Sequence, residues 1–272
     1  MTRRLAVVAG AGALAPQVIE AALAAGDTVR VFALTPQQLP PHVAQESASL
    51  QDPVALFDAI RAFGASHLTL AGALTLGDAD RQRLIAALGG AGHPTGDAAL
   101  SNLAMGLQQV TGAKLVGPHQ VALDLLAPIG VIAGPAPHLD QLATAKVAMQ
   151  AARQVGAMDL GQAAVAAGGR VVAVEDVGGT DDLLARVARH RAAGLIGNSA
   201  EVSLVLAKAC KPQQPLFVDL PAIGPQTVAG AAGAGISLIA VEAGRTLLLE
   251  RIRLVAEANA LGIAIVGLST DG

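Results

Sequence analysis

Short apolar runs alternate with amphipathic segments along the first half of the chain. A short apolar run between turn residues is typical of a strand that is buried on both faces of a parallel sheet. Apolar residues three and four positions apart instead indicate a helix. The runs predict strands at Leu5–Ala9, Thr28–Ala33, His67–Ala71 and Lys114–Val116. The spaced segments predict helices at Pro16–Ala25, Pro53–Phe63, Asp78–Leu88 and Asp97–Val110. This alternation predicts an α/β fold with a parallel sheet between two layers of helices.

The second half mixes strands and helices again, after the segment Ile129–His138, which concentrates prolines and glycines. The pair Gly168-Gly169 lies between two apolar runs and predicts a hairpin, because both glycines tolerate a positive φ. Further strands are predicted at Ser203–Ala207, Leu216–Val218, Ser237–Val241 and Ile263–Gly267. Helices are predicted at Leu139–Val155, Thr180–Arg191, Gln226–Ala234 and Glu250–Ala260, with Thr180 as the N-cap of the second. We therefore expect a parallel-sheet domain over residues 1–132 and a second α/β domain over residues 138–272.

The composition changes this picture little. Hydrophobic residues make up 53% of the 272 residues, and the mean hydropathy is +0.53. No stretch offers the roughly 18 uninterrupted apolar residues of a spanning helix, so we attribute the hydrophobicity to buried strands and Ala-rich helices. The apolar run after Arg4 is short and leads into a glycine turn, which favours a first strand over a signal peptide. The single cysteine, Cys210, cannot form an internal disulfide, which fits a reducing compartment, and we expect a cytoplasmic protein.

Charge, aromatic content and histidine spacing exclude several classes of function. The formal net charge is −3 and no basic tract is present, which argues against nucleic-acid binding. The chain has no Trp or Tyr and only 4 Phe, so it offers few side chains on which bases stack. None of its 6 histidines is paired at metal-ligand spacing, which argues against a zinc site.

The turn from Gly10 to Ala15 reads GAGALA and matches the pattern G-x-G-x-x-A between a predicted strand and a predicted helix. A dinucleotide site of this kind also needs a carboxylate at the end of the second strand. That strand ends in Val31-Phe32-Ala33-Leu34, without an acid, which disfavours an NAD-dependent oxidoreductase. Two interpretations stay open, a tight turn that needs small residues and a phosphate-contacting loop with Gly10 and Gly12.

The densest group of polar residues follows predicted strands of the second half. Lys208 and Lys211 come at the end of one strand, and Asp219 comes directly after the next. Strand ends followed by turns are where α/β proteins bind ligands. Two lysines can hold a diphosphate, and a neighbouring carboxylate can hold Mg²⁺, which keeps most of its water ligands. The alternative is an ordinary strand exit with a capping aspartate and two solvated lysines.

Several sequence blocks resemble the LpxI family, in the same order along nearly the whole chain. They are GAGALA (10–15), GPHQVALDLLAPIGVI (117–132), DLGQAAV (159–165), VVAVED–GGTDDLL–R (171–186), LAKACKP–Q–VDLPAIGP–T (206–227) and VEAG (241–244). The resemblance implies a Rossmann-like N-terminal domain and a C-terminal domain of the family's own type. It also implies Mg²⁺-dependent hydrolysis of UDP-2,3-diacylglucosamine to UMP and 2,3-diacylglucosamine 1-phosphate in lipid A biosynthesis.

The resemblance also implies roles for individual residues. Asp219 is expected to be the catalytic acid, at or near the metal, and Lys208 and Lys211 to face the diphosphate. Other residues expected at the substrate are Gly10, Gly12, Gln162, Thr180, Asp181, Gly224, Thr227 and Glu242. We further expect a homodimer that binds a UDP-linked acylated sugar and contacts the inner membrane peripherally.

The chain departs from the family pattern at a few positions. Gly178 stands where the family has a glutamate, Ala222 where it has a threonine, and Pro215 and Phe217 where it has an acid and an arginine. The N-terminal turn has alanines, Ala11 and Ala15, where the family has a glycine and a proline. The departures at Gly178, Pro215 and Phe217 favour an alternative hypothesis, a relative that binds the nucleotide sugar without turnover.

Overall fold

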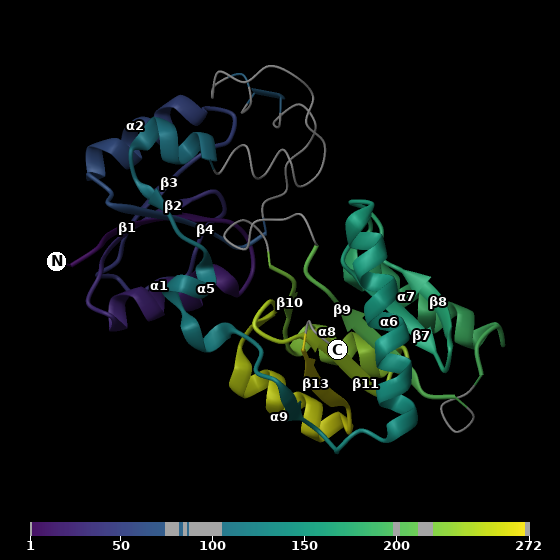
Figure 1. Ribbon diagram of the computed structural model, residues 1–272. Helices are drawn as coiled ribbons and strands as arrows, with labels where there is room; N and C mark the ends of the chain where they lie inside the picture. The colour runs from purple at the N-terminus through teal and green to yellow at the C-terminus, as the bar shows by residue number, and fades with distance from the viewer. Residues whose placement is uncertain are drawn as a thin grey trace. The chain divides into compact units, whose positions relative to one another are not determined.

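The computed structural model describes residues 2–73, 82, 83, 86, 105–197, 202–211 and 220–269. The described residues form two compact units, which meet in the sequence between Asp124 and Leu125. Each unit contains its own sheet (Figure 1). Two predicted segments, the helix Asp78–Leu88 and the strand Leu216–Val218, lie wholly or largely outside the described residues.

The first unit contains a five-stranded parallel sheet in the order β3-β2-β1-β4-β5. The strands are β1 (Arg4–Ala9), β2 (Thr28–Ala33), β3 (Ala44–Ser47), β4 (His67–Ala71) and β5 (Lys114–Leu115). The central strand β1 is almost wholly buried, as its unbroken apolar run predicts. This strand order is that of a Rossmann-like sheet. The predicted α/β class and the parallel sheet are therefore confirmed.

Helices cover both faces of the first sheet (Figure 1). On one face lie α1 (Leu14–Ala24) and α5 (Pro118–Val121), and a short 3₁₀ helix, η1 (Leu123–Leu125), follows. On the other face lie α2 (Pro53–Phe63) and the helical residues 105–111, whose Leu107 belongs to the same apolar core. The side chain of Asp52 caps α2 by accepting from the Ala55 amide, and Gly64 ends the helix at a φ of 67°.

The second unit contains a mixed six-stranded sheet in the order β6-β13-β11-β9-β7-β8. The strands are β6 (Gly130–Ala133), β7 (Ala163–Ala167), β8 (Arg170–Val174), β9 (Leu204–Lys208), β11 (Leu238–Glu242) and β13 (Ala264–Leu268). The strands β9, β11 and β13 are parallel, whereas β7 runs antiparallel to β9 and β6 antiparallel to β13. A separate short parallel pair joins β10 (Ala222–Ile223) and β12 (Leu247–Leu248).

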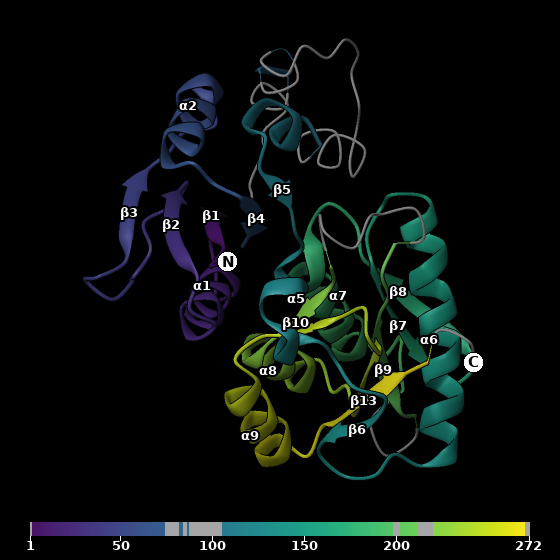
Figure 2. The ribbon, with the colours of Figure 1, turned by 60° about the vertical axis from the view of Figure 1, so that its left-hand side comes forward.

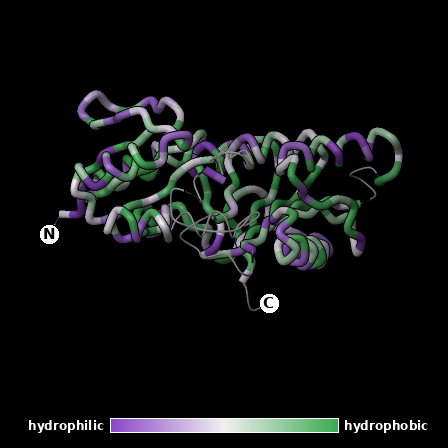
Figure 3. Tube along the Cα trace, turned by 90° about the horizontal axis from the view of Figure 1, so that it is seen from above, coloured by the Kyte–Doolittle hydropathy of each residue, from purple (hydrophilic) through white to green (hydrophobic). Residues whose placement is uncertain are grey.

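The two faces of the second sheet carry different helices (Figure 2). One face packs against α6 (Leu139–Ala157), and the other packs against α7 (Gly179–Ala192), α8 (Pro225–Gly233) and α9 (Arg251–Leu261). Successive strand residues alternate between these layers, so Leu206 faces α7–α9 and Ala207 faces α6. Figure 3 shows the hydropathy along the Cα trace, in which hydrophobic and hydrophilic stretches alternate.

Two of the differences from the sequence-based predictions concern the domain boundary and the start of α7. Residues 130–132 were placed in the first domain, but β6 is paired with β13 in the sheet of the second unit. Thr180 is not an N-cap, because α7 begins at Gly179, with Gly178 before it, and Thr180 lies in the first turn. Within the described ranges, no helix combines the length and the hydropathy that crossing a bilayer requires.

Candidate functional site

The candidate site lies in the second unit, at the edge of the sheet where β9 and β11 end. Lys208 is the last residue of β9, and Glu242 is the last residue of β11. Because the two strands are parallel, their carboxyl ends meet at one edge. The antiparallel strand β7 begins at this edge, since Ala163 pairs with Lys208, and so Gln162 lies here too. The fold thus brings together three residues that the sequence predicted for the site.

Lys208 is buried, with 6% of its surface exposed, and its ammonium group is held by defined acceptors. The Nζ atom donates to the Thr180 hydroxyl at 2.9 Å and to the Ala222 carbonyl at 3.1 Å. The Thr180 hydroxyl in turn donates to Glu175 Oε1 at 2.6 Å. The other carboxylate oxygen, Glu175 Oε2, accepts from the backbone N–H of Gln162 at 2.7 Å. We refer to Gln162, Glu175, Thr180 and Lys208 as the Lys208 network.

Lys211 follows shortly after Lys208 and forms an ion pair with Asp159 at 2.8 Å. Asp159 adopts a φ of 57°, a left-handed conformation that is uncommon for residues other than glycine. The Lys211 stem passes close to α6, since a Cβ added to Gly156 would lie 3.3 Å from Lys211 Cγ. Lys208 thus ends β9, and Lys211 follows it at the carboxyl edge of the sheet.

Among the described carboxylates at this edge, Glu242 is the most deeply buried, with 2% of its surface exposed. Its Oε1 atom forms an ion pair with Arg153 Nε at 2.6 Å, and its Oε2 atom accepts from the Cys210 amide at 2.9 Å. Hydrogen bonds and an opposite charge of this kind are what a buried carboxylate requires. Glu242 therefore fixes the backbone between Lys208 and Lys211, and the structure indicates an anchoring role for it.

The remaining residues predicted in the second unit lie at two helix N-termini. Thr227 accepts from the Gly224 amide at 3.3 Å, so both residues form the start of α8. This start comes directly after β10, whose Ala222 holds Lys208. Asp181 is exposed in the first turn of α7, next to Thr180. A negative charge in a first helical turn is favourable, which accounts for Asp181 without a ligand.

Gly10 and Gly12 belong to the first unit, in the turn between β1 and α1. Gly12 has a φ of 94°, which favours glycine there. The Gly10 amide donates to the Ala71 carbonyl at 2.8 Å, and its carbonyl accepts from Gln37. A Cβ on Gly72 would lie 2.7 Å from the Ala11 carbonyl oxygen, so this turn packs closely against the end of β4. These contacts favour the tight-turn interpretation for Gly10, whose amide is already used.

Asp219 lies outside the described residues, as do Pro215 and Phe217. Among the residues that are described, no group of three or more His, Cys, Asp or Glu side chains is arranged to hold a metal ion. Glu175 accepts two hydrogen bonds, and Glu242 is neutralised by Arg153. The described residues therefore include no cluster of three or more such side chains that could hold Mg²⁺.

Three residues of this region were not predicted to have a role: Glu175, Arg153 and Asp159. The sequence could have indicated Glu175, because it directly follows the apolar run after Gly169, which forms β8. Arg153 had none, since it is one of several polar residues in a long helix and lies 89 positions from Glu242. Asp159 is 52 positions from Lys211, and only the fold brings the two together.

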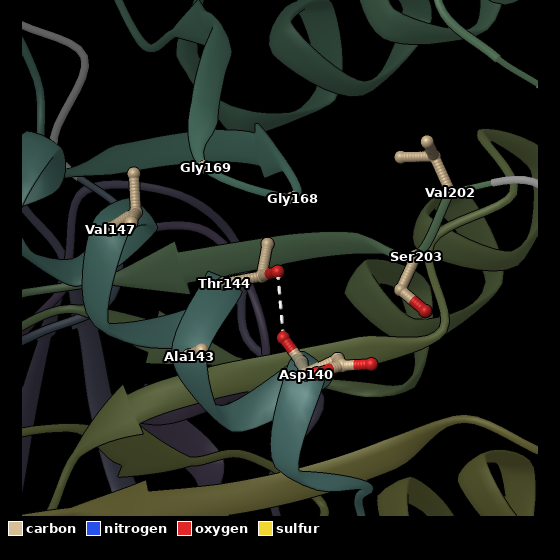
Figure 4. A pocket seen from close by; sticks show the side chains of 8 residues that line it. All are labelled: Asp140, Ala143, Thr144, Val147, Gly168, Gly169, Val202 and Ser203. Carbon is tan, nitrogen blue, oxygen red and sulfur yellow. Dashed lines mark hydrogen bonds between the residues drawn. The ribbon is translucent and has the colours of Figure 1, made fainter.

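A separate cavity of about 440 Å³ lies at the opposite edge of the second sheet (Figure 4). It is lined by Asp140, Ala143, Thr144, Val147, Gly168, Gly169, Val202 and Ser203. These residues lie near Leu204, at the start of β9, whereas Lys208 ends that strand. Thr144 donates to the backbone of its own helix, and Asp140 is exposed. The cavity thus has no buried charged group in its described lining and is distinct from the candidate site.

Comparison with known proteins gives a consistent result over both units. Residues 4–125 match the LpxI N-terminal domain, and residues 128–266 match the LpxI C-terminal domain. The UDP-2,3-diacylglucosamine pyrophosphatase LpxI of Caulobacter vibrioides is 34% identical over 276 aligned positions, which cover 98% of each chain.

Two solved structures show weaker similarity. A short-chain dehydrogenase/reductase superfamily protein of Agrobacterium tumefaciens with bound NAD is 28% identical, covers 40% of this chain and 30% of its own, and has a TM-score of 0.27. The UDP-glucose 4-epimerase of Thermus thermophilus, in complex with NAD, is 16% identical, covers 98% and 86%, and has a TM-score of 0.33. At these TM-scores neither structure supports a conclusion about this chain.

Proposed function

This chain belongs to the LpxI family, whose two domains it matches in order, and we propose that it hydrolyses the diphosphate of UDP-2,3-diacylglucosamine in lipid A biosynthesis. The relative that carries this activity in its name aligns with 98% of the chain. In the reaction, a water oxygen bonds to one phosphorus while the bond from that phosphorus to the bridging oxygen breaks. A proton of the water passes to a base or to solvent, and UMP and 2,3-diacylglucosamine 1-phosphate are released.

The observation that carries this proposal is the buried ammonium group of Lys208 at the carboxyl edge of the parallel strands. A charged group is costly to bury unless it is paired, and the fold supplies Thr180 and Ala222 as acceptors. An ammonium group held in a partly dry site stabilises negative charge more strongly than one in water. These contacts support the proposal that Lys208, at the end of β9, and Lys211, shortly after it, bind the diphosphate and stabilise charge that develops on its oxygens.

Mg²⁺ and Asp219 belong to this proposal through the family resemblance. Mg²⁺ binds through one or two carboxylates together with substrate phosphates, so a single aspartate is a sufficient protein ligand. Asp219 is three positions before Ala222, whose carbonyl oxygen holds Lys208. When bound, the ion would neutralise the diphosphate and activate water.

The test is to incubate the purified chain with UDP-2,3-diacylglucosamine and to measure UMP, with Mg²⁺, with Mn²⁺ or with a chelator. We expect UMP release that stops on chelation and returns when Mg²⁺ is added. Lys208→Met should lower kcat/KM by about 100-fold or more, the scale for losing a charged group that stabilises the transition state. Lys146→Met is the matched control, since this lysine of α6 lies outside the proposed site. Absence of UMP from the wild type under all these conditions would contradict the proposal.

The second candidate, a binding protein without turnover, is favoured by Gly178. A Cβ at this position would lie 2.9 Å from Asp182 Cβ, and Asp182 is paired with Arg186 at 2.9 Å. A side chain at position 178 would therefore collide with the ion-paired Asp182, which leaves no room for the glutamate that the family resemblance implies there. A wild type that binds the UDP-sugar in calorimetry but releases no UMP would favour this candidate.

The proposal also includes the cellular location and the oligomeric state of the protein. We expect a homodimer in the cytoplasm that contacts the inner membrane peripherally, where an acylated sugar resides. Met158, Leu160 and Val177 support this contact, because these exposed apolar side chains lie in the two loops that also carry Asp159 and Glu175. Flotation with anionic lipid vesicles and light scattering test the two expectations separately.

A further inference from the structure

Glu175 is a buried carboxylate, 6% exposed, that neither the sequence nor the proposed reaction has assigned a role. It follows β8 directly and lies at the same edge of the sheet as Lys208. We propose that Glu175 is a positioning residue for the reaction, which orients the Thr180 hydroxyl and, through it, the Lys208 ammonium group. This inference rests on the proposed function for its catalytic consequence, whereas the positioning itself is independent of turnover.

The direction of the hydrogen bonds in the network follows from the chemistry of the three groups. An ammonium group only donates, an ionised carboxylate only accepts, and a hydroxyl has one proton to give. Thr180 therefore gives its proton to Glu175, at 2.6 Å, and presents a lone pair to Lys208, at 2.9 Å. The short O–H···O distance is that of a hydrogen bond to a charged acceptor. Glu175 thus determines how the hydroxyl is turned toward Lys208.

Glu175 itself is held rigidly enough to act in this way. The backbone N–H of Glu175 donates to the Ala163 carbonyl at 2.8 Å, and the second carboxylate oxygen accepts from the backbone N–H of Gln162. A Cβ on Gly161 would lie 2.8 Å from Glu175 Cβ, so the two loops are in close contact. The Gln162 carbonyl also accepts from the Ala209 amide at 2.9 Å, which ties the start of β7 to the residue after Lys208.

Replacing the Glu175 carboxylate by an amide leaves one acceptor atom where the structure has two donors, the Gln162 backbone N–H and the Thr180 hydroxyl. In Glu175→Gln, the side-chain amide oxygen must face the backbone N–H of Gln162, which can only donate. The side-chain nitrogen, also a donor, then faces Thr180. The Thr180 hydroxyl would receive donors from two sides and lose the acceptor for its own proton. The two lone pairs of the Thr180 oxygen can still accept both donors, so the variant keeps the shape of Glu175 but removes the acceptor that turns the hydroxyl toward Lys208.

Lysine side-chain NMR tests the positioning without any enzyme assay. The chain has only four lysines, so protein labelled with ¹⁵N-lysine gives at most four ammonium signals, and Lys208→Met identifies one of them. Glu175→Gln and Thr180→Val should shift or broaden the Lys208 signal, whereas Thr180→Ser should keep it, because serine retains the hydroxyl. Asp176→Asn, a change at the neighbouring acid that is paired with Arg186, should leave it unchanged. A Lys208 signal that is the same in Glu175→Gln as in the wild type overturns the proposal.

The kinetic test separates this inference from the proposed function. If the wild type releases UMP, Glu175→Gln should lower kcat by about 10- to 100-fold, the scale for one hydrogen bond to a charged group. In a Thr180→Val background the same change should cost less than about 3-fold, because the path through the hydroxyl is already broken. Equal losses in both backgrounds overturn the proposal. A wild type without activity refutes the proposed function alone, and the NMR result still decides the positioning.

A purely structural role for Glu175 predicts a different set of results. It would lower the thermal midpoint of Glu175→Gln but leave kcat per folded molecule and the Lys208 signal as in the wild type. If Glu175→Gln does not fold, the comparison of Thr180→Ser with Thr180→Val carries the test. Equal Lys208 signals in those two variants would then overturn the inference.

Discussion

Replacing Arg153 by methionine is the sharpest test of how the carboxyl edge of the second sheet is stabilised. Arg153 forms the ion pair with Glu242, whose side chain is 2% exposed, and methionine keeps most of the apolar stem while removing the charge. The variant leaves a buried carboxylate with only the Cys210 amide as a described partner. Removing one partner of a buried pair costs about 3–5 kcal/mol.

The exposure of Arg153 reduces this value. Its side chain is 32% exposed, so water can enter and hydrate the carboxylate in the variant. We therefore expect a loss of roughly 2–3 kcal/mol in the free energy of unfolding. For a domain of this size that corresponds to a fall of roughly 4–12 °C in the thermal midpoint. Urea titration followed by circular dichroism, together with differential scanning calorimetry, measures both quantities.

Arg253→Met is the matched control, because Arg253 pairs with Glu250 at the surface and its side chain is 72% exposed. That substitution should cost less than about 1 kcal/mol. The double variant Arg153→Met/Glu242→Gln should recover at least half of the stability lost by Arg153→Met, since no charge is then left buried. Equal stabilities of Arg153→Met and Arg253→Met, or no recovery in the double variant, would refute the reasoning.

Three further predictions concern catalysis, backbone geometry and pH. Asp219→Asn should lower UMP release by about 10²–10⁴-fold, the scale for a positioned acid or base, while calorimetry still detects UDP-sugar binding; equal turnover in variant and wild type would exclude Asp219. Gly134→Ala should cost at least twice as much unfolding free energy in urea as Gly262→Ala, which costs about 1–2 kcal/mol from its left-handed backbone alone. Both glycines have a positive φ, but only at Gly134 would a Cβ meet backbone, 2.0 Å from the Ile263 carbonyl oxygen; similar losses would contradict this. Burial lowers the pKa of His119, so the unfolded chain binds a proton near pH 6.5 that the folded chain does not yet bind. Stability should therefore fall as the pH drops below about 6.5 and level off below the folded pKa, and His119→Gln should flatten that part of a pH series of thermal midpoints.

The order of helices and strands in this chain could be predicted from the sequence, because buried segments appear there as apolar runs. An unbroken apolar run such as Leu5–Ala9 predicts a strand covered on both faces, and β1 is the buried centre of its sheet. The ends of such runs are visible as well, which is why Lys208 was predicted at the site. Glu242 was expected there from the family resemblance, and both residues lie at the ends of adjacent parallel strands.

The partners of these side chains were decided only by the tertiary structure. Thr180 has the residue type of an N-cap, yet its hydroxyl donates to Glu175, because the N-cap of α7 is Gly178, two positions before Thr180. Arg153 lies 89 positions from Glu242 in the sequence, and no local pattern records such a pair. Hydropathy is a property of each residue by itself, and so its pattern along the chain predicts which segments are buried. The hydrogen bonds of a buried charge depend on which strands are neighbours, and that is determined by the packing of the whole sheet.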